Sequence, residues 1–360
     1  MLQPSPMSLT VAEDSLLAYA RGRLDDALNV PKENLFRRHF DLAGLDMTVW
    51  FASERLAAFC ESALVRQRTG NLGASRLEIF AMDARCEGWD SPASWREAAG
   101  FSSRTFERIL ASGDLRGFYH HDAPSWQFFD RGSATGVQTL PSELGMPPWE
   151  RGSPLRLFIH WAHAAKGRRL AHAATLGLYG RGCLIVGPSG SGKSGTTLAG
   201  LLNGLSSVGD DYVLLDQSAE ITAYAVFSVF KQDREGLSRA GIAPETFGNV
   251  EPNWRGKIEF DAARLVPHAF AERMDIRAIL IPEVARARRT RMESVSPRSA
   301  ALALAPSAVL QLPGDTATGF RFFADIARRL PAFRLVLSED PAEIADVIGT
   351  FLSKEVARSD

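Results

Sequence analysis

Residues 187–194 are Gly187-Pro188-Ser189-Gly190-Ser191-Gly192-Lys193-Ser194, a stretch that fits the phosphate-binding pattern G-x-x-x-x-G-K-[ST]. The residues before it, Cys183-Leu184-Ile185-Val186, form an apolar run typical of a short buried strand. Segment 196–205 carries leucines at helical spacing and predicts a helix directly after the loop. The alternative is a Gly/Ser-rich turn without a ligand. The strand and helix on either side favour a nucleoside triphosphate site instead.

The positions of this loop have chemical roles in holding a triphosphate. Small residues allow consecutive backbone N–H groups to surround the phosphates, and the N-terminus of the next helix adds partial positive charge. We expect Lys193 to reach the β- and γ-phosphates and the Ser194 hydroxyl to ligate Mg²⁺. The residues expected to bind the nucleotide phosphates are therefore Gly187, Ser189, Gly190, Ser191, Gly192, Lys193, Ser194 and Gly195.

The composition favours a soluble, cytoplasmic enzyme. The chain has 360 residues, of which 45% are hydrophobic and 23% charged, enough for substantial cores. Its net charge of −1 predicts no general attraction to nucleic acid or to an anionic membrane. The cysteines lack the spacing of a metal site and favour a reducing compartment. We find no apolar run of membrane-spanning length and no secretory signal, so the cytoplasm is the expected location.

The hydrophobic pattern predicts two domains. We expect residues 1–150 to form a smaller N-terminal α/β domain, which could serve in substrate docking, and residues 151–360 to carry the phosphate loop. The proline-rich segment 140–149 marks the predicted boundary. In the first domain the pattern predicts strands at 46–51, 76–82, 117–120, 126–130 and 137–140, and helices at 53–67, 91–99 and 103–111.

The segment between the boundary and the loop narrows the class of protein. Ser153 and Pro154 suit the N-cap and first position of a helix, which should end near residues 166–167. Residues 169–178 predict a strand, and Tyr179-Gly180-Arg181-Gly182 predicts a hairpin turn into the strand that feeds the loop. A strand–turn–strand before the loop is not the usual start of a Ras-like or ATPase domain.

Asp210 and Asp211 follow the loop after one predicted helix and a return strand. Phosphate-loop proteins place their metal-binding acid at about this position. Two neighbouring carboxylates can divide the work, because one can hold Mg²⁺ while the other accepts the proton of an attacking hydroxyl. An isolated Gly-Asp-Asp would be a surface turn, but its distance from the loop favours the functional interpretation.

Lysine is rare in this chain, since only six of the 41 basic residues are lysines. A lysine is therefore a candidate for a position that needs a compact ammonium group. Lys231 and Lys257 are candidates to neutralise phosphate charge in a transition state, and the alternative for each is a solvated side chain. The basic cluster 286–291 could guide an acidic peptide, but a solvated loop is favoured.

The sequence resembles HPr kinase-like proteins in several motifs that occur in the same order. The specific ones are the phosphate loop and Gly209-Asp210-Asp211. Looser ones are His172-Ala173-Ala174, the turn 179–182, Lys257-Ile258-Glu259-Phe260, Leu304-Ala305-Pro306-Ser307 and residues 330–335. The resemblance is strongest to HPr kinase-related proteins that phosphorylate a serine of a ribosomal precursor peptide, including lasso peptide precursors. The signature of true HPr kinase/phosphorylases is not found, so HPr itself is not the implied acceptor.

The resemblance implies an α/β fold with an HPr kinase-like C-terminal domain. It also implies ATP and Mg²⁺ as cofactors, and transfer of the γ-phosphate to a serine of a peptide or protein. Lys193, Asp210, Asp211 and His172 would then be catalytic, with His172 orienting an acid or touching the substrate, and Lys231 and Lys257 near the nucleotide. The alternative for His172 is a hydrogen-bonded histidine of the core. We expect Ser194 and Asp211 to hold Mg²⁺ and Asp210 to accept the proton, although close carboxylates share such roles.

Two alternatives from other classes remain at this point. A small-molecule alcohol kinase would use the same chemistry in a closed pocket, with residues 1–150 as a lid. A nucleotide-gated binding protein would use hydrolysis to change shape and would turn over slowly without an acceptor. The sequence leaves the acceptor and any homo-oligomer open.

Overall fold

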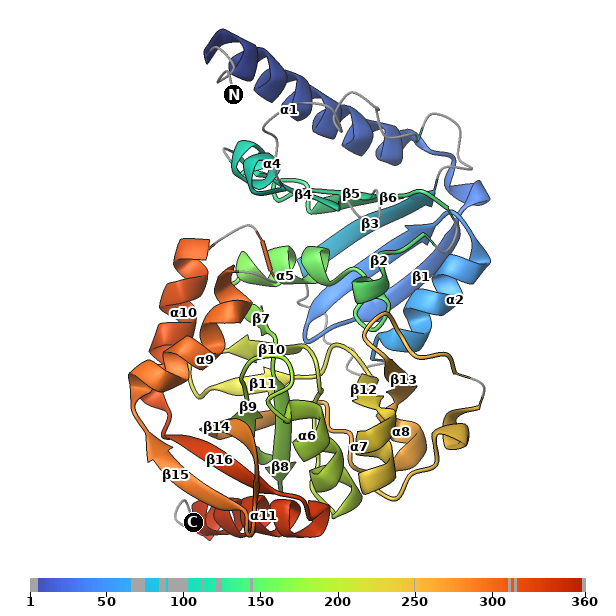
Figure 1. The fold of residues 1–360 in the computed structure, drawn as a ribbon. Helices are drawn as coiled ribbons and strands as arrows, with labels where there is room; N and C mark the ends of the chain where they lie inside the picture. The colour runs from blue at the N-terminus through green and yellow to red at the C-terminus, as the bar shows by residue number, and fades with distance from the viewer. Residues whose placement is uncertain are drawn as a thin grey trace, which may run out of the picture. The chain divides into compact units, whose positions relative to one another are not determined.

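The structure, a computed structural model, describes residues 6–65, 75–83, 89, 103–111, 113–120, 125–142, 145–248, 250–309, 312–313 and 316–357 (Figure 1). It separates into two compact units. Unit 1 comprises residues 1–62 and 68–165, and unit 2 comprises residues 63–67 and 166–360. Both units are mixed α/β, so the predicted class agrees with the structure at that level.

Unit 1 is built on a mixed six-stranded sheet in the order β1-β2-β3-β6-β5-β4. Alternate side chains of its strands face a core that contains Phe80, Trp126 and Phe128, and the helices α1 and α4 contribute to that core. The elements of unit 1 are α1 (Pro6–Asn29), η1 (Lys32–Asn34), β1 (Phe36–Asp41), β2 (Leu45–Phe51), α2 (Glu54–Ala63), β3 (Ser75–Asp83), α4 (Ser103–Leu110), β4 (Leu115–His120), β5 (Ser125–Asp130), β6 (Thr135–Leu140), η2 (Pro148–Glu150) and α5 (Arg156–Ala164).

The strands predicted for residues 1–150 are found within about two residues of their expected bounds. Buried and half-buried residues alternate along β2, whereas β4, β5 and β6 are short, almost wholly buried runs bounded by turns. The helix predicted at 103–111 is α4, and the one predicted at 53–67 is the shorter α2. The helix predicted at 91–99 lies outside the described residues.

The predicted cap at Ser153 and Pro154 is wrong. Helix α5 begins at Arg156, and Leu155 occupies the N-cap position with a φ of 59° and without a side-chain cap. The backbone before the helix forms a turn, in which the N–H of Ser153 donates to the carbonyl of Glu150. Helix α5 packs in unit 1, where Trp161 stacks on Phe129. Unit 1 therefore extends to residue 165, whereas the sequence predicted a boundary at residue 150.

The proline-rich segment before α5 ends in a buried carboxylate. Glu150 is fully buried and its oxygens lie 3.0 Å from His120 Nε2, 3.0 Å from Gln127 Nε2 and 3.2 Å from Gln138 Nε2. Burial opposes ionisation, but the charges of His120 and Arg156 outweigh it and hold the pKa of Glu150 below its usual value. Three neighbouring strands are thus tied to η2 through one side chain.

Unit 2 is built on an eight-stranded sheet whose main path is β15-β16-β14-β11-β10-β7, with β9 paired to both β14 and β8. Helices α6 and α11 pack on β8 (Figure 1), and their core includes Leu176, Ile185 and Ile348. Its strands are β7 (Arg169–Ala171), β8 (Ala174–Leu178), β9 (Arg181–Ile185), β10 (Val213–Asp216), β11 (Thr222–Tyr224), β12 (Val229–Asp233), β13 (Lys257–Asp261), β14 (Arg273–Ala287), β15 (Arg291–Val295) and β16 (Ala332–Ser338).

A separate two-stranded ribbon, β12 with β13, carries its own small apolar core around Phe230 and Phe260. The helices of unit 2 are α6 (Lys193–Leu202), α7 (Arg234–Arg239), η3 (Pro244–Phe247), α8 (Ala262–Leu265), α9 (Pro297–Val309), α10 (Thr316–Arg329) and α11 (Pro341–Ala357).

The hairpin β8–β9 brings the chain to the phosphate loop. Tyr179 and Gly180 have φ values of 52° and 77°, as a tight two-residue turn requires, which confirms the predicted hairpin. The strand predicted at 169–178 is interrupted at His172 and Ala173, because β7 pairs with β10 whereas β8 pairs with β9. This interruption places His172 between two differently paired strands.

Unit 2 also contains a segment from early in the chain. The N–H of Val65 donates to Val226, and the N–H of Ser228 donates to Ala63. A fragment that begins at residue 151 would lose these backbone bonds, so the predicted boundary does not separate the two compact units cleanly.

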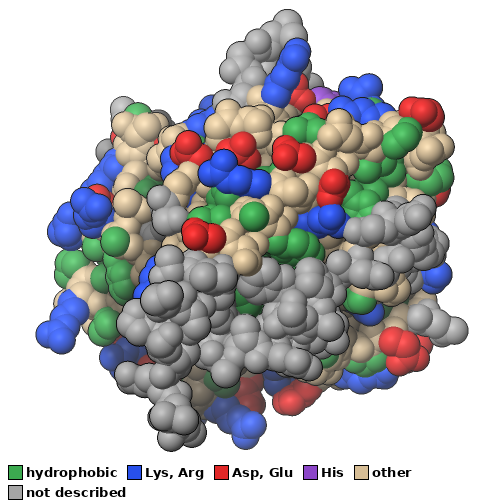
Figure 2. Space-filling view, turned by 90° about the horizontal axis from the view of Figure 1, so that it is seen from above, with side chains coloured by type: hydrophobic (Ala, Val, Ile, Leu, Met, Phe, Trp, Pro, Cys, Tyr) green, Lys and Arg blue, Asp and Glu red, His purple; other side chains and the backbone are tan. Residues whose placement is uncertain are grey.

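The surface carries both signs of charge. Figure 2 shows Lys and Arg side chains interspersed with Asp and Glu on one face, as expected for a net charge of −1. Among the described residues, the search for helices able to cross a membrane found none.

Candidate phosphate-binding and carboxylate site

The phosphate loop connects β9 to α6 and requires glycine at several positions. Gly187, Gly190 and Gly192 have φ values of 144°, 83° and 103°, which L-residues with a side chain rarely adopt. A Cβ atom on Gly192 would lie 2.7 Å from Leu337 Cδ1, so the backbone also lies close to β16. The motif therefore forms the strand–loop–helix turn that the sequence predicts.

Lys193 folds back onto this loop. Its ammonium Nζ donates to the carbonyl oxygens of Gly187 at 2.8 Å and Pro188 at 3.0 Å, and the residue is only 8% exposed. Burial lowers the pKa of Lys193, and the charges of Asp210 and Asp211 oppose that shift only in part. A desolvated cation on the inner side of the loop is suited to binding phosphate oxygens.

Asp210 lies just before β10 and is almost fully buried, with 3% exposed. Its Oδ2 accepts the backbone N–H of Lys231 at 3.2 Å, whereas its Oδ1 is buried without a hydrogen-bond partner among the described residues. Burial and then the charge of Asp211 raise the pKa of Asp210, although the backbone N–H of Lys231, the charge of Lys257 and the Ser194 side chain lower it in part. The unpaired oxygen and the nearby hydroxyl together fit a cation.

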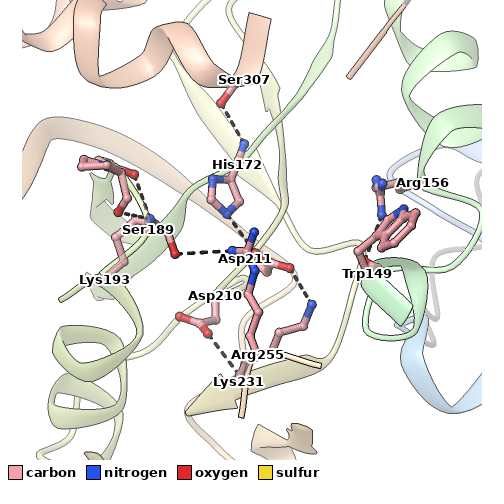
Figure 3. Close-up of polar contacts among 12 residues, drawn as sticks. Trp149, Arg156, His172, Ser189, Lys193, Asp210, Asp211, Lys231, Arg255 and Ser307 are labelled. Carbon is pink, nitrogen blue, oxygen red and sulfur yellow. Dashed lines mark hydrogen bonds and ion pairs between the residues drawn. The ribbon is translucent and has the colours of Figure 1, made fainter. Parts of the chain in front are cut away.

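Asp211 has a different environment, with a basic side chain beside each of its two oxygens. His172 Nε2 lies 3.0 Å from Oδ1 and Lys231 Nζ lies 2.8 Å from Oδ2 (Figure 3). Burial alone would favour the neutral acid, but Lys231 and His172 hold the pKa of Asp211 well below its usual value. Asp211 is therefore a carboxylate that remains ionised. Its side chain is 23% exposed.

His172 is held through its own main chain and through its ring. Its main-chain N–H donates to Ser307 Oγ at 2.9 Å, and its imidazole ring lies 5.4 Å from the ring of Tyr212. These contacts hold His172 beside Asp211. Ser307 belongs to α9, so one of the contacts comes from a distant part of the sequence.

Lys231 is shared by two carboxylates. It stands on β12 opposite Glu259 of β13, and its Nζ lies 3.7 Å from Glu259 Oε1. Burial would lower the pKa of Lys231, but Asp211 and Glu259 outweigh it and raise that pKa. Lys257 pairs with Asp233 in the same ribbon, and its charge acts on both Asp210 and Lys193. Both predicted lysines therefore lie at the site.

Sequence reasoning did not select three residues that the structure places here. Glu259 binds Lys231, Asn253 Nδ2 donates to Glu259 Oε1 at 2.9 Å, and Arg255 Nη1 lies 3.4 Å from Ser189 Oγ. Glu259 belonged to a recognised motif but had no assigned role. Arg255 gave no signal in a chain where arginine supplies most of the positive charge.

The residues present fit ATP and one Mg²⁺ ion. The search for groups of at least three His, Cys, Asp or Glu side chains able to hold a metal found none among the described residues. That result is compatible with Mg²⁺, which in kinases takes one or two carboxylates, phosphate oxygens and water. The buried, unpaired Oδ1 of Asp210 beside the Ser194 hydroxyl is the observation that supports the fit.

Comparisons with known proteins add little to this geometry. No family model matches the chain, and no curated protein matches it. Among solved structures, the Hpr(Ser) kinase/phosphatase from Coxiella burnetii matches with 13% sequence identity over 52% of this chain and 99% of that chain. The TM-score is 0.29, so the comparison is a weak link at the level of fold and carries no functional argument.

Proposed function

We propose that the protein is an ATP-dependent kinase that transfers the γ-phosphate to a serine hydroxyl of a peptide or protein. The observation that carries the proposal is the convergence of Lys193, Ser194, Asp210 and Asp211 around one glycine-rich loop. Lys193 supplies a desolvated cation for the phosphates, and the loop supplies backbone donors. The two carboxylates, which have different environments, supply a metal ligand and a proton acceptor.

Ser194 and Asp210 would hold Mg²⁺, which when bound neutralises charge on the phosphates. The support is the Ser194 side chain, which lies close enough to lower the pKa of Asp210, together with the buried Oδ1 of that carboxylate, which has no hydrogen-bond partner among the described residues. This assignment reverses the division expected from the sequence, in which Asp211 was the metal ligand. Asp211 is less suited to that role because its two oxygens already contact the side chains of His172 and Lys231.

Asp211 would accept the proton of the acceptor hydroxyl. A carboxylate oxygen has more than one lone pair, so the contacts to His172 and Lys231 leave Asp211 able to accept a further hydrogen bond. In the reaction the acceptor oxygen forms a bond to the γ-phosphorus, and the bond from that phosphorus to the β,γ-bridging oxygen breaks. ADP leaves with the electron pair, and the hydroxyl proton passes to Asp211.

A serine in a peptide is the acceptor that the motif resemblance favours. Asp211 is the more exposed of the two acids, with a 23% exposed side chain, whereas Asp210 is 3% exposed. An acceptor that approaches from solvent would therefore meet Asp211 first. This is the arrangement that a chain segment of another molecule requires.

The test is a phosphoryl-transfer assay with γ-labelled ATP, Mg²⁺ and a library of serine-containing peptides. We expect labelled phosphoserine and stoichiometric ADP with the wild-type protein. Lys193→Ala should lower the rate by at least about a hundredfold, because a cation is lost where charge accumulates. A matched control is Lys354→Ala, which removes an exposed lysine from α11. Equal rates for the two variants would refute the assignment of the site.

A further inference from the structure

Two side chains beside the phosphate loop have no role in the proposed mechanism. Trp254 is 54% exposed, which is high for a large aromatic residue. The Arg255 guanidinium lies 4.4 Å from the centre of the Trp254 ring, within cation–π distance. The same guanidinium reaches the loop, where Nη1 lies 3.4 Å from Ser189 Oγ (Figure 3). The Arg255 guanidinium therefore contacts an aromatic ring with one part and the phosphate loop with another.

The turn that presents this pair is held in place by Asn253. Its Oδ1 accepts the backbone N–H groups of Arg255 at 2.9 Å and Lys257 at 3.1 Å. Its Nδ2 donates to Glu259, which also lies 3.7 Å from Lys231. Asn253 thus connects the turn to the ion pairs around Asp211. The backbone at Arg255 is therefore held in place by hydrogen bonds.

The cations around the loop converge on one place. Burial is the main reason that the pKa of Lys193 is lowered; the charges of Asp210 and Asp211 oppose this shift, and those of Lys257 and Arg255 add to it. Positive groups that interact in this way repel one another, and an anion bound between them relieves the repulsion. A triphosphate has the charge to satisfy all three. The Ser189 hydroxyl is a weak partner at 3.4 Å, and a phosphate oxygen is a stronger acceptor for a guanidinium.

We infer that Arg255 binds the β- or γ-phosphate of the nucleotide, and that Trp254 is a positioning residue that holds the guanidinium by stacking. The inference rests on the proposed function and adds to it a second phosphate-binding side chain beside the loop. Arginine suits this role because its planar fork can donate two hydrogen bonds while its face remains stacked on an aromatic ring. Lysine at the same position would keep the charge but lose both features.

The first experiment compares Arg255→Gln and Arg255→Lys with the matched control Arg298→Gln, which removes an exposed guanidinium from α9. Calorimetry with ATP and with tripolyphosphate measures binding, and steady-state assays measure kcat and KM. We expect Arg255→Gln to weaken binding of both ligands at least about tenfold and to lower kcat about a hundredfold. We expect Arg255→Lys to restore part of the binding but little of kcat.

The outcomes separate the two proposals. If wild type binds neither ATP nor tripolyphosphate, the proposed function fails and this inference fails with it. If wild type binds ATP but Arg255→Gln matches Arg298→Gln in binding and kcat, the role of Arg255 alone is overturned. Circular dichroism of each variant confirms that the fold is retained.

The second experiment addresses Trp254. Trp254→Phe keeps an aromatic face and should retain most of the activity, whereas Trp254→Leu should lose about tenfold in kcat, with KM changed less. Both ATP and tripolyphosphate binding should weaken in Trp254→Leu, because the effect passes through Arg255. Loss of ATP binding without loss of tripolyphosphate binding would overturn the positioning role and indicate stacking on the base. Equal behaviour of the two variants would also overturn it.

Discussion

Asp210 and Asp211 are neighbours in the chain, yet their pKa values are displaced in opposite directions. Burial and the adjacent charge raise the pKa of Asp210, whereas Lys231 and His172 hold that of Asp211 well below its usual value. Asp210 accepts the backbone N–H of Lys231, whereas Asp211 contacts the side chains of His172 and Lys231, so each carboxylate meets a different set of partners. The two acids are therefore not interchangeable.

The two acids should differ in their response to metal. We expect Asp210→Asn to raise the Mg²⁺ concentration needed for half-maximal activity. We expect Asp211→Asn to lower kcat about a hundredfold or more at every Mg²⁺ concentration, because it removes the proton acceptor. Activity measured over a Mg²⁺ titration distinguishes them. The opposite pattern would restore the division expected from the sequence.

The same substitutions should change stability in opposite directions when Mg²⁺ is absent. The ionised form of Asp211 stabilises the fold at pH values above the usual pKa of an aspartate, and this contribution is lost as the pH falls through its depressed folded-state pKa. Asp210 carries the opposite sign, because its raised pKa means that ionisation costs stability at neutral pH. At pH 7, Asp211→Asn should therefore lower Tm and Asp210→Asn should raise it.

Thermal unfolding followed by circular dichroism measures this difference. A change of about 1 kcal/mol moves Tm by about 2–4 °C in a protein of this size class. The gap between the two variants should narrow as the pH is lowered toward 3. Equal Tm values at pH 7 would contradict the opposite environments of the two carboxylates.

His172 should act on catalysis by positioning Asp211. Replacing His172 by Ala removes a hydrogen bond to a charged group, which we expect to lower kcat about tenfold or more while KM for ATP changes little. His172→Asn places a smaller donor in the same direction and should recover part of kcat. Ser307→Ala, which loses only the contact to the His172 backbone, should have a smaller effect. A larger change in KM than in kcat would indicate a role in nucleotide binding.

Glu150 should matter for the stability of unit 1. Glu150→Ala leaves His120, Gln127 and Gln138 without their shared acceptor and should destabilise the protein by about 3–5 kcal/mol. The pKa of Glu150 is lowered, so its contribution is present above the usual pKa of a glutamate and lost as the pH falls through the folded-state value. Urea unfolding at pH 7 and at pH 4 checks both statements, with Glu61→Ala as a partly exposed control. A destabilisation no larger than that of the control would show that the network contributes little.

The phosphate loop and the hairpin before it could be predicted from sequence because their geometry is local. Glycines at positions 187, 190 and 192 determine where the backbone of the loop can turn, and Tyr179-Gly180 determines the hairpin from two adjacent residues. The predicted strands of unit 1 could be found for a similar reason, since alternation along β2 and short apolar runs between turn residues in β4 to β6 are both local signals. The prediction of an N-cap at Ser153 is wrong, because the N–H of Ser153 belongs to the turn after η2 and the helix begins at Arg156.

The environment of each acid in the site depended on tertiary structure. The partners of Asp211 come from His172, between β7 and β8, and from Lys231 on β12, and the ribbon partner of Lys231 is Glu259. Arg255 reaches Ser189 across 66 positions of sequence. A pKa is determined by the burial and charge around a group, and those are supplied by residues that only folding brings together. For that reason the sequence could identify the pair of acids, but the division of roles between them required the structure.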